Sequence, residues 1–116
     1  MILTLTIKKQ YFDLINDGSK VVEIRKDSDY YRRLLWREAN APKYLILHYQ
    51  SIQKLVCAVE NIALINNYFD PRPEFLGTDK VFEIRIRKIE VSTESTDVLR
   101  SRYSREFKAV GDGVFT

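Results

Sequence analysis

The chain has 116 residues, of which 45% are hydrophobic and 30% are charged, and its formal net charge is +3. This length favours one domain spanning residues 1–116 with a single core, and it excludes two domains of ordinary size. One cysteine excludes an internal disulfide, and with one histidine it leaves too few soft ligands for a usual structural zinc site.

Several classes of protein are excluded by what the sequence lacks. The start MILTLTIKKQ has neither the charged region nor the long apolar region of a signal peptide, and no apolar run is long enough to span a bilayer. We therefore expect a cytoplasmic protein without a membrane partner. The four glycines are scattered and form no phosphate-cradling loop, and no cofactor is expected. The shortage of cysteine and histidine likewise leads us to expect no metal.

The first half of the chain alternates strands with helices. Apolar residues alternate with threonines over residues 1–7, which predicts a strand. Three-to-four spacing predicts a helix over residues 8–17, and Gly18 ends it because glycine readily takes the left-handed conformation past a helix C-terminus. A second strand is predicted over residues 20–26 and a second helix over residues 30–38.

The next segment is rich in aliphatic residues. Pro42 ends the second helix, and the runs at residues 43–49 and 54–65 are separated by a length that suits a hairpin loop. Because both faces of the second run are apolar, we expect it to be a central strand that is buried on both sides.

Residues 81–91 give the clearest alternation of apolar and charged side chains and predict a further strand. A slip in that alternation predicts a β-bulge near Arg87-Lys88. Ser95 or Thr96 then begins the last helix. The order strand-helix-strand-helix-strand-strand-strand-helix excludes a doubly wound parallel sheet. It predicts an α+β domain built as a small, mostly antiparallel β-barrel with two to three short helices.

The chain's basic excess lies in one segment that also carries a motif. Residues 20–37 hold six Lys and Arg against three Asp and Glu. A Gly-x-Lys-x-x-Glu-x-Arg sequence follows the first helix, and Tyr-Tyr-x-Arg-Leu begins the second. This arrangement resembles the ASCH domain family, whose members have a PUA-like barrel fold. The resemblance is carried by eight residues: Gly18, Lys20, Glu23, Arg25, Tyr30, Tyr31, Arg33 and Leu34.

The resemblance implies a connection with RNA or modified nucleosides. Some members of the family bind RNA, some short bacterial members hydrolyse acylated cytidine, and ribonuclease activity is reported among them. In the amidohydrolase members the motif lysine acts with a threonine three residues later and with a downstream glutamate. Here Lys20 matches the lysine, but Glu23 stands where that threonine would be.

Two interpretations of Lys20, Glu23 and Arg25 follow from the residues themselves. Glu23 and Arg25 share one face of a strand, about 7 Å apart by strand rise. They could form an ion pair on an exposed face, which contributes about 0–1 kcal/mol. Alternatively, the three residues line a cleft. In a dry cleft the pKa of the Lys20 amine would fall and make it a base or nucleophile, whereas in a wet one the amine would bind phosphate as a point charge.

The second helix is both aromatic and basic. Tyr30, Tyr31 and Trp36 could stack on bases while arginines follow a nucleic-acid backbone. The tyrosines could equally belong to an apolar stripe that faces the barrel, together with Leu34 and Leu35. In that case the exposed, ligand-facing side would be formed by the arginines Arg32, Arg33 and Arg37.

Other residues carry weaker signals. Glu74 on a loop and Glu83 on a strand are downstream carboxylates that could pair with Lys20, although Glu83 suits an ion pair along the sheet better. His48 lies within an aliphatic strand and is expected to be structural. Cys57 is expected to be a buried, inert thiol.

We therefore expect the cleft to bind RNA, single-stranded nucleic acid or a nucleotide. Its ligand-binding residues would be Lys20, Glu23, Arg25, Tyr30, Tyr31 and Arg33. The alternatives are a small ribonuclease or amidohydrolase with Lys20 and Glu23 as catalytic residues, and a module that docks another protein through its basic helix. Whether the chain is an enzyme, which ligand it takes and its oligomeric state stay open at this stage.

Overall fold

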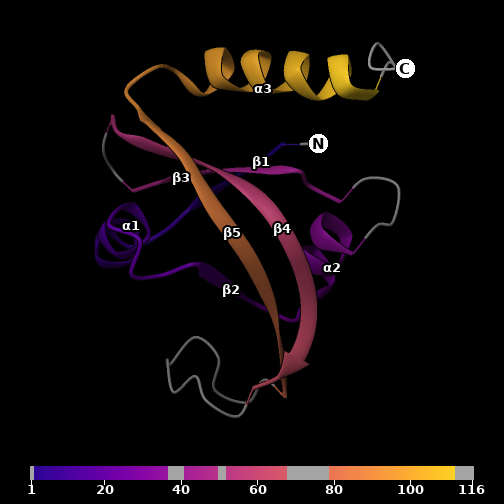
Figure 1. Ribbon diagram of the computed structural model, residues 1–116. Coiled ribbons are helices and arrows are strands. Elements are labelled where there is room, and N and C mark those ends of the chain that lie inside the picture. The colour runs from indigo at the N-terminus through magenta and orange to yellow at the C-terminus, as the bar shows by residue number, and fades with distance from the viewer. Residues whose placement is uncertain (1, 37–40, 50–51, 68–78, 112–116) are drawn as a thin grey trace.

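The computed structural model describes residues 2–36, 41–49, 52–67 and 79–111, with side chains described as far as residue 104. Its elements follow the predicted order (Figure 1). They are β1 (Ile2–Thr6), α1 (Lys9–Asn16), β2 (Val22–Lys26), α2 (Asp29–Leu35), β3 (Tyr44–His48), β4 (Lys54–Asn66), β5 (Lys80–Ser92) and α3 (Thr96–Gly111). The expectations for Arg37 and Glu74 fall outside the described residues.

Local signals fix the ends of the helices. Gly18 follows α1 with φ of +87°, the left-handed conformation that was predicted for it. The Ser28 hydroxyl caps α2 by accepting a hydrogen bond from the Tyr31 N–H at 3.2 Å. The Ser95 hydroxyl caps α3 in the same way, accepting from the Val98 N–H at 3.2 Å. Side-chain caps therefore explain where α2 and α3 begin, and the backbone freedom of Gly18 explains where α1 ends.

The strands form one mixed sheet in the order β1-β3-β4-β5-β2, and the sheet curls into a half-barrel. β1 pairs with β3 in parallel, whereas the pairs β3–β4, β4–β5 and β5–β2 are antiparallel. The small α+β, barrel-like fold that the sequence predicted is thus confirmed. The sheet is only half closed, with β1 and β2 at its two edges.

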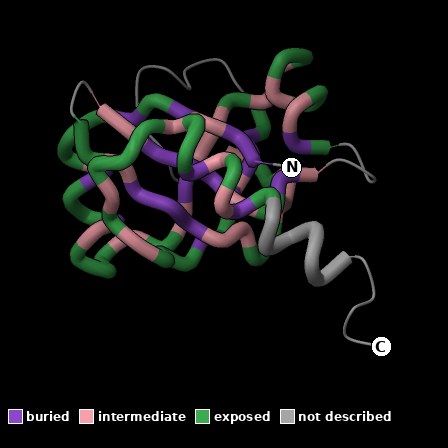
Figure 2. The backbone as a smooth tube through the Cα atoms, turned by 90° about the horizontal axis from the view of Figure 1, so that it is seen from above, coloured by how far each residue is buried: buried purple, intermediate pink, exposed green. Residues whose placement is uncertain are grey.

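Two apolar clusters hold the sheet. The larger lies on the inner face, where α1 and α2 contribute Phe12, Ile15 and Leu35 to side chains from β1, β3, β4 and β5. The smaller lies on the outer face, where α3 packs Leu99 and Tyr103 against β1, β3 and β4. Figure 2 shows that the buried stretches run along the strands in the middle of the molecule.

β4 is the middle strand of the sheet, as predicted, but it is buried on both faces only over Leu55–Cys57. The reason is that α3 covers only one end of the outer face (Figure 1). The predicted bulge in β5 lies at Ile89, one residue beyond Lys88, where the pairing with β4 shifts between Val56 and Cys57. A second irregularity in β4, at Glu60, had no sequence signal.

Cys57 is completely buried, as expected. Burial in the apolar core raises the pKa of its thiol to about 12, and the negative charge of Glu23 acts in the same direction. The reactive thiolate is therefore almost absent near neutral pH.

Among the described residues, no helix is both long enough and apolar enough to cross a membrane.

We predict that Cys57 in the folded protein does not react with a thiol reagent such as dithionitrobenzoate over an hour at pH 8. The same thiol should react fully within minutes in denaturant, because unfolding exposes it and returns its pKa to the ordinary range. Stoichiometric reaction of the folded protein within minutes would contradict the buried placement.

We also predict that Leu99→Ala lowers the free energy of unfolding by about 2–5 kcal/mol, the usual cost of truncating a fully buried leucine. Val98→Ala is the matched control, since Val98 is the preceding residue of α3 and is 46% exposed. Urea unfolding would measure both. Equal effects of the two changes would show that α3 does not pack on the sheet as described.

Candidate functional site

Two charged side chains of β2, Glu23 and Arg25, point to the inner face of the half-barrel. Glu23 pairs with Ile84 and Arg25 with Phe82, and both partners belong to the inner apolar cluster. Directly opposed residues of an antiparallel pair point to the same side of the sheet. Glu23 is only 2% exposed, and it is a buried charged residue. This burial excludes the alternative of an ion pair on an exposed face.

Arg25 links β2 to two other elements. Its Nη2 donates to the Thr6 carbonyl of β1 at 3.0 Å and lies 3.4 Å from Glu23 Oε2. Its Nη1 donates to the Tyr31 hydroxyl of α2 at 3.1 Å, and the guanidinium lies 5.8 Å from the centre of the Tyr31 ring. One side chain therefore joins both edge strands of the sheet and a helix.

These contacts lie at the unpaired edges of the sheet. The Val21 carbonyl accepts a hydrogen bond from the Ile86 N–H of β5, so the backbone groups of Val22 and Ile24 face the opposite, open side. There Glu23 Oε1 accepts from the Ile24 N–H at 3.0 Å, and the Lys20 amine donates to the Val22 carbonyl. Charged side chains of the motif thus bind backbone groups that no neighbouring strand can pair.

We call this set, made of Lys20, Glu23, Arg25 and Tyr31, the edge cluster. Its members come from the motif that the sequence singled out. Glu23, Arg25 and Tyr31 are joined directly, whereas Lys20 joins the same strand edge through Val22 and lies 5.6 Å from the centre of the Tyr11 ring.

The remaining predicted site residues lie on α2, at its surface. Tyr30 is 56% exposed and contacts the Tyr31 ring edge-on, with ring centres 5.0 Å apart. Arg33 is exposed as well. Arg32 forms two hydrogen bonds with Asp27, at 2.6 and 3.0 Å, so it is committed to its own helix terminus. The apolar stripe that faces the core is formed by Tyr31, Leu34 and Leu35.

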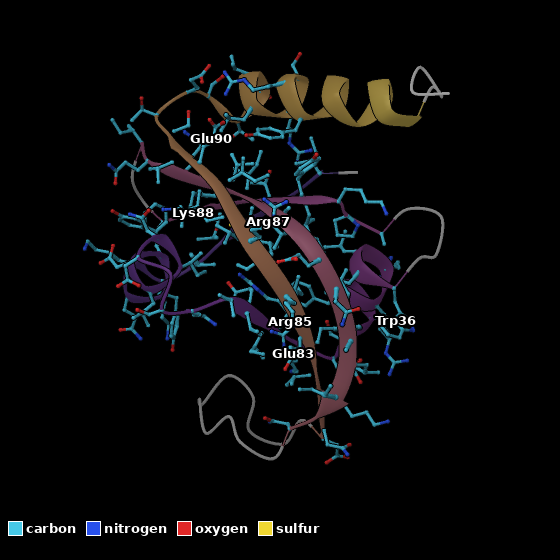
Figure 3. The ribbon with its side chains drawn as sticks, viewed as in Figure 1. Trp36, Glu83, Arg85, Arg87, Lys88 and Glu90 are labelled. Carbon is cyan, nitrogen blue, oxygen red and sulfur yellow. The ribbon has the colours of Figure 1, made fainter. Side chains whose placement is uncertain are left out.

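Lys20 also lines a hollow of about 420 Å³ between the end of α1 and β5. We call it the basic hollow, because four bases and two acids line it. The bases are Lys20, Arg85, Arg87 and Lys88, and the acids are Asp17 and Glu60. Figure 3 shows Arg85, Arg87 and Lys88 along β5. No local sequence pattern indicated that residues 85–88 would lie beside Lys20, because this proximity arises from the pairing of β2 with β5.

Contacts hold part of this lining in place. The Lys88 amine donates to the Asn16 carbonyl at 2.8 Å and lies 3.2 Å from Asn16 Oδ1. Arg85 lies 3.6 Å from Glu83, so Glu83 forms an ion pair along the sheet rather than a contact with Lys20. Hydrogen bonds from the Ser19 side chain and from the Ser19 N–H, the latter at 2.8 Å, lower the pKa of the Asp17 carboxyl group. Arg87 is exposed on the same strand and completes the row.

A second hollow, of about 470 Å³, lies beside α2 and β4. We call it the Trp36 hollow. Trp36 is half exposed at its side, and the ring centre is 5.5 Å from that of the buried Phe82. The walls are completed by Leu35, Ala41, Pro42, Lys43, Val59, Glu60, Asn61 and Ile62. Glu60 therefore lines both hollows.

The other candidates have structural environments. The His48 ring nitrogen lies 3.3 Å from the Thr6 hydroxyl, and the His48 carbonyl accepts the Ile7 N–H at 2.8 Å. Among the residues that the structure describes, no three of His, Cys, Asp and Glu gather in a way that could hold a metal ion.

We predict that Arg25→Met lowers the free energy of unfolding by about 3 kcal/mol, because it leaves the buried Glu23 carboxylate without its cation. Arg32→Met removes the same group from the exposed pair with Asp27 and should have a much smaller effect. Urea unfolding would measure both variants. Adding Glu23→Leu to Arg25→Met should recover part of the loss, and the absence of both effects would contradict the cluster.

No family model matches this sequence, and it matches neither a curated protein nor a solved structure. The edge cluster and the two hollows are therefore the features from which a function can be inferred.

Proposed function

We propose that this chain is an ASCH-type domain that binds RNA or a nucleotide, and that the basic hollow holds phosphate groups of the ligand. The observation that carries the proposal is the lining of this hollow by Lys20, Arg85, Arg87 and Lys88, twice as many bases as acids. A phosphate is attracted to clustered cations, and lysine and arginine are its usual protein ligands.

The edge cluster gives this hollow its position. Lys20 binds the edge of β2 through the Val22 carbonyl, and β2 pairs with the part of β5 that carries Arg85. Arg25, which is paired with Glu23, holds β2 against β1 and α2. In this proposal Glu23 supports the binding surface from within, and the cations around the hollow contact the ligand.

Binding is favoured over the catalytic alternative by the burial of Glu23. A ribonuclease or amidohydrolase that paired Lys20 with Glu23 would need the Glu23 carboxylate to reach a substrate atom. That carboxylate is 2% exposed, and its two oxygens contact the Ile24 N–H and Arg25. Cations outnumber acids among the groups that line the hollow with Lys20, and this excess suits phosphate binding.

We predict that Lys20→Ala and Arg87→Ala each weaken binding of a short, dye-labelled single-stranded RNA several-fold. Each should also reduce the slope of log affinity against log salt by about 0.7, because one phosphate contact is lost. Fluorescence anisotropy at several salt concentrations would measure both quantities.

Lys9→Ala is the control, since Lys9 is exposed at the opposite end of α1 and pairs with Asp13. It removes the same charge without changing the hollow. If Lys20→Ala and Arg87→Ala bind RNA as the unaltered chain does, the basic hollow is not the phosphate site. If the unaltered chain binds no RNA or nucleotide, the proposal itself is wrong.

A further inference from the structure

Trp36 presents a partly exposed aromatic ring at the wall of a hollow. The side chain is half exposed, although the ring contacts the buried Phe82. Its neighbours in the Trp36 hollow include apolar side chains, Pro42, Val59 and Ile62. The volume of about 470 Å³ falls within the roughly 300–1,000 Å³ of ligand pockets.

The chemistry of the hollow suits a planar ligand with polar edges. An aromatic ring and aliphatic walls favour the flat face of a ring system, because stacking and apolar contact both operate there. Lys43, Glu60 and Asn61 supply charged and amide groups at the rim. A nucleobase has this combination, with an apolar face and hydrogen-bonding edges.

The position of the hollow connects it with the basic hollow. Glu60 lines both and lies at the irregularity where the β4–β5 pairing shifts between Val59 and Asn61. Figure 3 shows Trp36 beside α2, with Arg85 and Arg87 along β5. A ligand could therefore place a base in one hollow and a phosphate in the other.

We propose that Trp36 is a base-stacking residue, and that the ligand is a single-stranded oligonucleotide which places one base in the Trp36 hollow and its phosphates in the basic hollow. This inference rests on the proposed function and adds the location of a base. The Glu60 carboxylate repels phosphate, so it separates the two contacts and accepts a hydrogen bond from an amino group of the base. Hydrogen bonds of this kind to base edges provide discrimination between bases.

The chain contains one tryptophan, so its fluorescence reports on Trp36 alone. Titrating the protein with dye-free hexacytidine RNA should quench this fluorescence, because a stacked base contacts the indole. The abasic ribose-phosphate hexamer is the matched ligand. It offers the same phosphates without bases, so it should bind without the quenching.

Trp36→Leu should weaken binding of dye-labelled hexacytidine about tenfold, the loss expected for one unstacked base, while leaving the affinity for the abasic hexamer unchanged. Trp36→Phe keeps an aromatic ring and should retain most of the affinity. Thermal unfolding would confirm that both variants are folded, and quenching in the unaltered chain provides a second readout if they are not.

The outcomes separate the two proposals. Anisotropy that shows RNA binding without Trp36 quenching, together with an unchanged affinity of Trp36→Leu, would overturn the stacking role and leave the phosphate site standing. Equal quenching by the abasic hexamer would also overturn it. Absence of RNA binding by the unaltered chain would overturn the proposed function and this inference together.

Discussion

The structure depends on how the backbone groups at the two open edges of a half-closed sheet find hydrogen-bond partners. β1 and β2 end the strand order and share no backbone pairing, so each would present unpaired N–H and C=O groups. Arg25 connects these edges by donating to the Thr6 carbonyl while it pairs with the buried Glu23. Glu23 and Lys20 bind backbone groups of β2 itself. Three charged side chains thus form some of the hydrogen bonds to backbone groups that a further strand pairing would form in a closed barrel.

This arrangement explains how one short motif influences distant residues. Holding β2 in place also fixes its pairing with β5, and that pairing brings Arg85, Arg87 and Lys88 beside Lys20. α3 covers only one end of the outer face, while Arg85 and Arg87 remain exposed on β5 (Figure 1). The binding surface is therefore a consequence of strand pairing and of the incomplete cover by helices, and the motif contributes one cation to it directly.

Periodicity was sufficient to predict the element order, the helix end at Gly18 and the shared face of Glu23 and Arg25. It did not indicate which face of β2 lies inside. The apolar Val22 and Ile24 would ordinarily mark the core side, but here the charged face is buried because it binds the open edges. The grouping of Lys20 with residues 85–88, and the sharing of Glu60 by two hollows, depend on long-range pairing that local sequence patterns do not encode.

Amide hydrogen exchange at Ile24 tests most directly whether charged side chains satisfy the backbone groups at the open edges of the sheet. Its N–H faces an open edge, where an unpaired amide exchanges rapidly, but the Glu23 carboxylate accepts it at 3.0 Å. We expect the Ile24 amide to be strongly protected from exchange in the unaltered chain. In Glu23→Ala this protection should be lost while the amides of β3 stay protected. Rapid exchange of Ile24 in the unaltered chain, or protection that does not change in Glu23→Ala, would contradict this role of the charged side chains.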